Sequence, residues 1–238
     1  MAVAAAVLLA GCGGVLKKEY EYEEELYLAL DGSATLYVYA SVPALVALRG
    51  IDLDVSPRAR LDRERLRAIF RAPGVEPRIS TSRRDGRRFV HVRVDAADVM
   101  QLRQMAPFAW SDYRFARQGD IYEYRQVVGA AAGKPVGDVG WTGAELVAFR
   151  MHVPSKIPFH NAPSRTVERG NILEWEQRLD ERLKGTPIEL HVKMETQSIL
   201  SRTLLLFATT IVAAAFTFAL VIWWIARRGQ TEIAESRS

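Results

Sequence analysis

The strongest constraint on this chain is an apolar run near its C-terminal end. Residues Leu204 to Ile225 (LLLFATTIVAAAFTFALVIWWI) are 22 consecutive residues without a charge. A helix of that length extends about 33 Å, enough to cross a hydrocarbon layer of about 30 Å. Two tryptophans close the run, where indole rings favour the headgroup level, and two arginines follow at once. The run predicts a transmembrane helix over 203–226, with the tail 227–238 in the cytoplasm.

A second membrane signal lies at the other end of the chain. Cys12, the one cysteine, directly follows Leu-Ala-Gly at the end of a short apolar run. This pattern has the form of a bacterial lipobox, at which a signal peptidase cuts before a cysteine that has received a diacylglyceryl group. We expect a signal peptide over 1–11 and fatty acylation, such as palmitate, at Cys12. The first charges come after the apolar run, which leaves open a weak signal or a start upstream. An uncleaved anchor over 2–16 is the alternative, but it is too short to span.

Both ends then lie on the same membrane, and the residues between them form one extracytoplasmic domain over 12–200. The composition, 49% apolar and 25% charged, is that of a globular domain. A domain of this size buries about 70% of its unfolded surface. The single cysteine excludes an intramolecular disulfide framework, so packing must hold the domain together. We expect a single-pass protein of the bacterial cytoplasmic (inner) membrane with an N-terminal lipid anchor.

The first half of this domain shows clear local patterns. Apolar residues alternate over 20–30 and 35–42 around an Asp-Gly turn, which predicts a β-hairpin. Residues 43–50 read as a short helix that begins with proline, ends before glycine and is apolar on nearly all sides, so it should be buried. Asp62 is placed to cap a second helix. The core face of that helix is predicted to consist of Leu66, Ile69 and Phe70.

The second half reads mainly as strands. A second hairpin is expected over 76–82 and 89–94, and Asp95 should cap a third helix that ends at Pro107. Because strands outnumber helices and most neighbours are hairpin-connected, we expect an α+β fold, with a few short helices on one face of a largely antiparallel sheet. The remaining predicted strands cover 108–115, 121–128, 146–152, 171–176 and 188–194.

Arginine is concentrated between residues 49 and 93, where thirteen arginines face six acidic residues. Two patterns stand out: three arginines at helical spacing of four, and four arginines crowded at the tip of the second hairpin. A solvated face and a polar turn are the ordinary interpretation. The alternative is an anion site, because arginine forks bind phosphate bidentately and anionic leaflets attract basic residues. The acidic stretch 19–25 could equally pair with these arginines inside the fold or in a neighbouring copy. The candidate anion-binding residues are Arg63, Arg67, Arg71, Arg83, Arg84, Arg87 and Arg88.

Other chemical motifs fail on spacing. The stretch Gly129 to Pro135 lacks one residue between its glycines and the Ser or Thr that a phosphate loop needs after Lys134. The histidines show no compact zinc spacing, so we expect hydrogen-bonded structural roles for His152 and His160. No Gly-x-Ser-x-Gly elbow occurs. We therefore expect no catalytic residue, no metal site and no cofactor, and we expect the chain not to be an enzyme.

One late stretch supports a family resemblance. The sequence Gly170-Asn-Ile-Leu-Glu-Trp175, together with the lipobox, an early LDGSATLYV hairpin and the terminal span, resembles the LppM-like domain family of bacterial envelope lipoproteins. The resemblance implies a sheet-rich α+β ectodomain and a surface-anchored, non-enzymatic role linked to lipids or the envelope. Trp175 is expected in the core, and acylation of Cys12 is the one family site carried over.

The sequence therefore favours a membrane-anchored envelope lipoprotein whose basic surface binds anionic lipid headgroups or another envelope anion. Its expected partners are membrane lipids, with a membrane protein as the second candidate. Nucleic acid is not expected, because an extracytoplasmic domain would rarely meet it. The second hypothesis is a structural subunit of a membrane protein complex.

Overall fold

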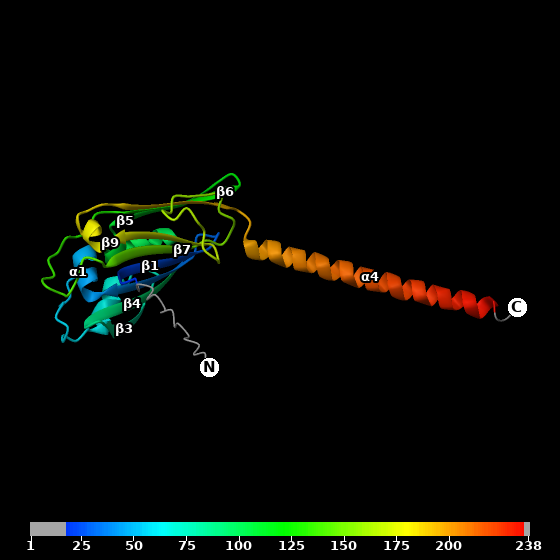
Figure 1. Ribbon diagram of the computed structural model, residues 1–238, viewed down its shortest axis with the longest axis horizontal. Helices are drawn as coiled ribbons and strands as arrows, with labels where there is room; N and C mark the ends of the chain where they lie inside the picture. Colours follow the sequence, from blue (N-terminus) through cyan, green and yellow to red (C-terminus); the bar gives the residue numbers. More distant parts are fainter. Residues whose placement is uncertain (1–17, 236–238) are drawn as a thin grey trace, which may run out of the picture.

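The computed structural model describes residues 18–235, and the side chains of 18–198 and 203–225. A two-sheet domain occupies 18–198, and one long helix, α4 (Ile199–Glu235), projects from it (Figure 1). Cys12 and its predicted lipidation lie outside the described residues. The span that is long and apolar enough to cross a membrane is Thr203–Ile225, and its side chains are exposed along its length.

The larger sheet has six strands in the order β3-β4-β2-β1-β7-β9. Its neighbours are antiparallel, except that β1 and β7 run parallel. The expected hairpin of β1 and β2 is confirmed, with Leu28 opposite Ala34 across the turn. The strands are β1 (Tyr20–Leu28), β2 (Ala34–Ser41), β3 (Arg78–Arg84), β4 (Arg87–Ala96), β7 (Leu146–His152) and β9 (Ile172–Arg178).

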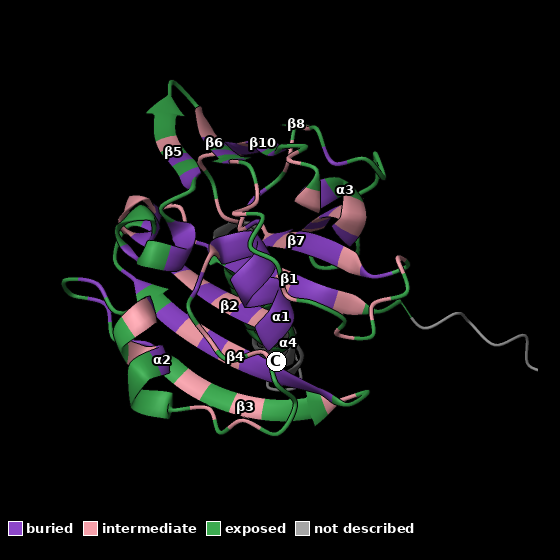
Figure 2. Cartoon of the chain, turned by 90° about the vertical axis from the view of Figure 1, so that its left-hand side faces the viewer, coloured by how far each residue is buried: buried purple, intermediate pink, exposed green. Residues whose placement is uncertain are grey.

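The smaller sheet has four antiparallel strands in the order β5-β6-β10-β8. It packs over the inner face of the larger sheet, and one cluster of buried side chains, including Tyr22, Phe149, Tyr124 and Val192, joins the two. Figure 2 shows the smaller sheet beside β7 and β1. Its strands are β5 (Ser111–Gln118), β6 (Ile121–Val128), β8 (Phe159–His160) and β10 (Ile188–Glu195).

The predicted helix after the first hairpin is confirmed as α1 (Val42–Arg49), and every one of its residues is buried (Figure 2). Ser41 caps its start by accepting a hydrogen bond from Ala44, and Gly50 ends it with a φ of 67°. Residues 132–134 cover the end of α1, because the amides of Ala132 and Gly133 donate to the Leu48 and Ala47 carbonyls. Part of the stretch rejected as a phosphate loop, including Gly133, therefore covers a buried helix.

The remaining helices are short. Asp62 caps α2 (Arg63–Phe70) as expected, and Leu66 and Phe70 are buried while Ile69 is partly buried. The others are α3 (Leu179–Leu183) and two 3-10 helices, η1 (Val99–Gln104) and η2 (Ala106–Phe108).

The predicted α+β class is confirmed, and three details differ. The strands form two sheets rather than one. The third helix is η1, capped by Asp98, because β4 continues to Ala96 and holds Asp95 opposite Thr35, which donates a hydrogen bond to its carboxylate at 2.8 Å. The strand expected from Phe108 begins at Ser111, after η2.

Candidate arginine site

The four arginines expected at a hairpin tip are part of the strands themselves. The turn consists of Asp85 and Gly86 alone, with φ values of 50° and 74°. The ladder therefore continues outward, pairing Arg83 with Arg88 and Arg84 with Arg87. Successive side chains of a strand point to opposite faces. The pleat splits the four arginines into two pairs, and the single cluster predicted from the sequence is wrong in this respect.

Arg84 and Arg87 lie on the outer face of the larger sheet and are neutralised within the fold. The Nε of Arg87 lies 3.0 Å from a carboxylate oxygen of Glu21, and Glu19 lies 3.8 Å from its Nη2. Arg84 packs over the ring of Phe89 at 4.3 Å and lies 4.0 Å from Glu21. Pairing with the acidic stretch 19–25, an alternative that the sequence left open, accounts for this half of the cluster.

Arg83 and Arg88 lie on the opposite face, against the segment between α1 and α2. Arg88 is only 4% exposed. Its Nη1 donates to the Ala59 carbonyl at 2.8 Å and its Nη2 donates to the Asp54 carbonyl. Within residues 18–235 it forms no ion pair with a carboxylate. Burial lowers the pKa of the Arg88 guanidinium, Asp54 opposes that shift, and Arg83 adds to it.

Arg88 forms part of the wall of a cavity of about 370 Å³ that we call the arginine pocket. Five arginines line it, and no carboxylate does. Four of them are exposed, come from three different parts of the chain and form no ion pair in the described part of the chain. The lining residues are Arg58, Ala59, Arg60, Leu61, Arg63, Thr81, Ser82, Arg83 and Arg88.

The three arginines expected on one helix face do not act together. Arg67 pairs with Glu64 one turn away. Arg71 lies beyond the last helical residue, Phe70, and its Nη2 lies 2.5 Å from a carboxylate oxygen of Glu76. Arg63 alone of the three lines the arginine pocket.

Arg58 and Arg60 are pocket residues that the sequence reasoning did not single out. They lie in a segment without regular structure between α1 and α2, so neither helical nor strand periodicity marked them. The available signal was the stretch Ser-Pro-Arg-Ala-Arg, in which two arginines follow a proline within a short loop.

Three of the four histidines lie in local hydrogen bonds, whereas the hydrogen-bonded role expected for His160 is not seen, because its Nδ1 is buried without a partner among the described residues. The Nε2 of His152 lies 2.6 Å from Glu25 and its ring stacks on Tyr27, while His191 lies 2.6 Å from Glu123. Among the described residues, no group of three or more His, Cys, Asp or Glu side chains is arranged to hold a metal ion. Trp175 is buried in the core, as expected.

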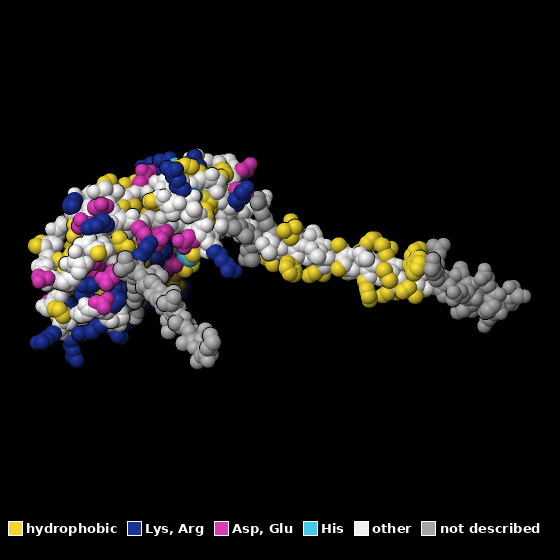
Figure 3. Space-filling view, viewed as in Figure 1, with side chains coloured by type: hydrophobic (Ala, Val, Ile, Leu, Met, Phe, Trp, Pro, Cys, Tyr) yellow, Lys and Arg dark blue, Asp and Glu magenta, His cyan; other side chains and the backbone are white. Residues whose placement is uncertain are grey.

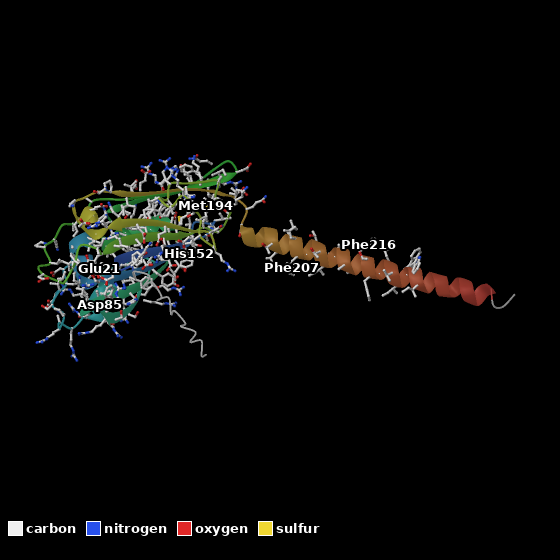
Figure 4. All side chains as sticks on the ribbon, in the orientation of Figure 1. Glu21, Asp85, His152, Met194, Phe207 and Phe216 are labelled. Atoms are coloured by element: carbon white, nitrogen blue, oxygen red, sulfur yellow. The ribbon has the colours of Figure 1, made fainter. Side chains whose placement is uncertain are left out.

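The arginine pocket lies at the end of the domain away from α4. Figure 4 places Asp85 and Glu21 at that end, whereas His152 and Met194 lie near the start of α4. Lysine and arginine side chains project from the same distant end in Figure 3. The start of β1 lies there too, since Arg84 donates to the Tyr20 carbonyl at 2.5 Å.

Comparison with known proteins adds one similar fold. No family model and no curated protein matches this chain. It is similar to the NMR structure of the folded domain of LppM from Mycobacterium tuberculosis, with 13% identity, a TM-score of 0.40, and coverage of 78% of this chain and 95% of that one. A likeness at this level carries no argument about function, so the family resemblance stays a prediction.

Proposed function

We propose that this chain is a non-enzymatic, membrane-anchored protein of the bacterial envelope whose folded domain binds anions through a basic surface. The arginine pocket is the observation that carries the proposal. Five arginines converge there without a carboxylate in the lining. Like charges held together repel one another, and a bound anion would relieve that repulsion.

The membrane part of the proposal rests on α4. Its segment Thr203–Ile225 is long and apolar enough to span, and its exposed side chains have no protein around them in the described residues. The arginines that follow the span favour a cytoplasmic tail, which would place the domain outside the cytoplasmic membrane. Acylation of Cys12 remains a prediction from the lipobox.

The test uses the full chain in nanodiscs of phosphatidylcholine, with soluble polyphosphate as the probe. We expect binding that weakens as salt rises, because the contacts are between exposed charges. Changing Arg58, Arg60, Arg63 and Arg83 together to Ala should abolish most of it. These side chains are exposed and form no ion pair in the described residues, so the domain should still fold.

A matched control separates a site from overall charge. Changing four other exposed arginines to Ala removes the same net charge elsewhere and should leave binding nearly unchanged. Equal losses in the two variants would contradict the assigned surface. The alternative, a structural subunit, would be favoured if the natural chain does not bind polyphosphate and co-purifies with a membrane protein at fixed stoichiometry. The control residues are Arg103, Arg114, Arg165 and Arg169.

A further inference from the structure

Among the described residues, Arg88 and Arg182 are buried arginines without an ion pair, and of these two Arg88 lines the arginine pocket. Arginine carries five N–H donors and remains charged in proteins. Two backbone carbonyls, those of Ala59 and Asp54, accept from its two terminal nitrogens and fix its position. Carbonyls carry no net charge, and no carboxylate of the described residues forms an ion pair with Arg88, so only the more distant Asp54 offsets its charge although the residue is 4% exposed. Burying an unpaired charge is costly, and an anion beside it would remove that cost.

The acidic residues that flank the pocket residues in sequence are engaged elsewhere, and one of them, Asp85, lies 3.7 Å from the Nε of Arg84. The Asp54 carboxylate accepts from the Ser56 amide at 2.8 Å. Asp62 caps α2 by accepting from the amides of Glu64 and Arg65. Both carboxylates satisfy backbone donors and neither forms an ion pair with Arg88, so Asp54 lowers the cost of the buried charge only through longer-range attraction.

The walls of the pocket complete a set of convergent donors. Arg58 and Arg60 come from the segment before α2, Arg63 is the first residue of α2, and Arg83 belongs to β3. Thr81 and Ser82 add hydroxyl groups. Guanidinium forks that approach from several directions match a tetrahedral oxyanion better than a planar carboxylate, which presents two oxygens in one plane.

Resting on the proposed function, we infer that the arginine pocket is a binding site for a phosphate group, with Arg88 as its fixed floor and Arg58, Arg60, Arg63 and Arg83 as its adjustable walls. The cavity of about 370 Å³ falls within the range of small-molecule sites, about 300–1,000 Å³. It therefore has room for the group to which the phosphate is attached. Arg88 also borders a neighbouring cavity of about 500 Å³ on the other side of the same segment.

The test measures binding of pyrophosphate and of inorganic phosphate to the full chain in phosphatidylcholine nanodiscs by calorimetry, with acetate as the planar comparison. Both phosphates should bind more tightly than acetate. Arg58→Ala and Arg83→Ala should each weaken pyrophosphate about tenfold, the loss expected for one charge-assisted contact. Arg114→Ala, an exposed arginine outside the pocket, should leave it unchanged.

Arg88→Lys tests the floor of the pocket. Lysine keeps the charge but loses the fork, so affinity should fall while the melting temperature stays within a few degrees of the natural chain. If Arg88→Lys fails to fold, Arg58→Ala and Arg83→Ala still decide the matter. Unchanged pyrophosphate affinity in both of those variants would overturn the inference, as would acetate binding as tightly as phosphate.

The remaining arms identify the source of the phosphate. With phosphatidylglycerol added to the same nanodisc, headgroups of the chain's own leaflet would compete and weaken pyrophosphate binding. Unchanged affinity would identify a soluble or externally presented phosphate. Either result upholds a phosphate site. Loss of phosphate selectivity with retained polyphosphate binding would sink this inference and leave the broader anion-binding function standing.

Discussion

At the scale of single residues, the domain contains buried arginines that pair with a carboxylate and buried arginines that do not. Glu24 of β1 and Arg49 at the end of α1 are both buried, with the Nη2 of Arg49 2.6 Å from a carboxylate oxygen of Glu24. The hydroxyl of Tyr22 donates to Glu24 and accepts from the Nε of Arg49 at 3.0 Å. Glu24, Arg49 and Tyr22 therefore satisfy one another, whereas the guanidinium of Arg88 has only carbonyl partners.

This difference predicts the effect of removing one partner. Arg49→Met should destabilise the domain by about 3–5 kcal/mol, because it leaves Glu24 buried without a countercharge. Adding Glu24→Leu should recover a large part of that loss, since both charges are then gone. Denaturant unfolding of the full chain in mild detergent measures both free energies. A single variant as stable as the double variant would contradict the pairing.

At the scale of elements, α1 depends on the glycine that ends it. Gly50 has a φ of 67°, and a Cβ added there would lie 3.2 Å from the Cβ of Ala132 in the covering segment. Gly74 has a φ of 75° with open space around it. The two glycines therefore share the backbone constraint and differ in packing.

Gly74→Ala should cost about 1–2 kcal/mol, the strain of a left-handed residue with a side chain. Gly50→Ala should cost more, because it adds the displacement of Ala132, whose amide donates to α1. Denaturant midpoints of the two variants against the natural chain provide the comparison. An equal or smaller loss of stability for Gly50→Ala would show that the segment around Ala132 can move away without cost.

The elements themselves were largely readable from the sequence. Alternation over 20–42 and the Asp-Gly turn predicted β1 and β2, and the cap at Asp62 predicted α2, because these signals are local. The parallel pairing of β1 with β7 joins Glu25 to Arg150, and no local pattern records such a contact. The division of the strands into two sheets was missed for the same reason.

The candidate site was half predictable. Arg63, Arg83 and Arg88 were named from the sequence, and all three line the arginine pocket. A two-residue turn at Asp85 and Gly86 would have separated Arg83 and Arg88 from the other pair, since the pleat alternates faces. Arg58 and Arg60 depend on how an irregular segment folds back on β4, which periodicity does not determine.

At the scale of the whole molecule, the direction of β1 limits the orientation that the domain can take relative to the membrane. β1 begins at the end away from α4, beside Arg84, and runs toward α4 over nine residues, about 27 Å. From Cys12 to Tyr20 there are eight residue steps, which reach at most about 26–29 Å when fully extended. If Cys12 carries a lipid, an upright domain would require the residues between Cys12 and Tyr20 to be nearly fully extended.

This limit predicts an effect of the lipid on orientation. In a nanodisc with a fluorescent lipid, a dye on a cysteine placed at Asp85, in a chain with its lipid at Cys12, should lie nearer the bilayer than in the Cys12→Ser chain. Lengthening this segment by inserting glycines and serines before Lys18 should restore the greater distance. Equal energy transfer in all three chains would show that the segment does not constrain the domain.

Because β1 begins at the end of the domain away from α4, the segment before it limits how far that end can lie from the membrane. If the acyl chain on Cys12 is inserted in the leaflet from which α4 emerges, the residues between Cys12 and Tyr20 can leave full extension only when the domain tilts. That tilt brings the arginine pocket toward the headgroups. Cleavage of that segment would let the domain rise and turn the same pocket outward. The number of residues between the acylated cysteine and β1 would then determine whether the pocket faces headgroup phosphates or phosphates outside the membrane.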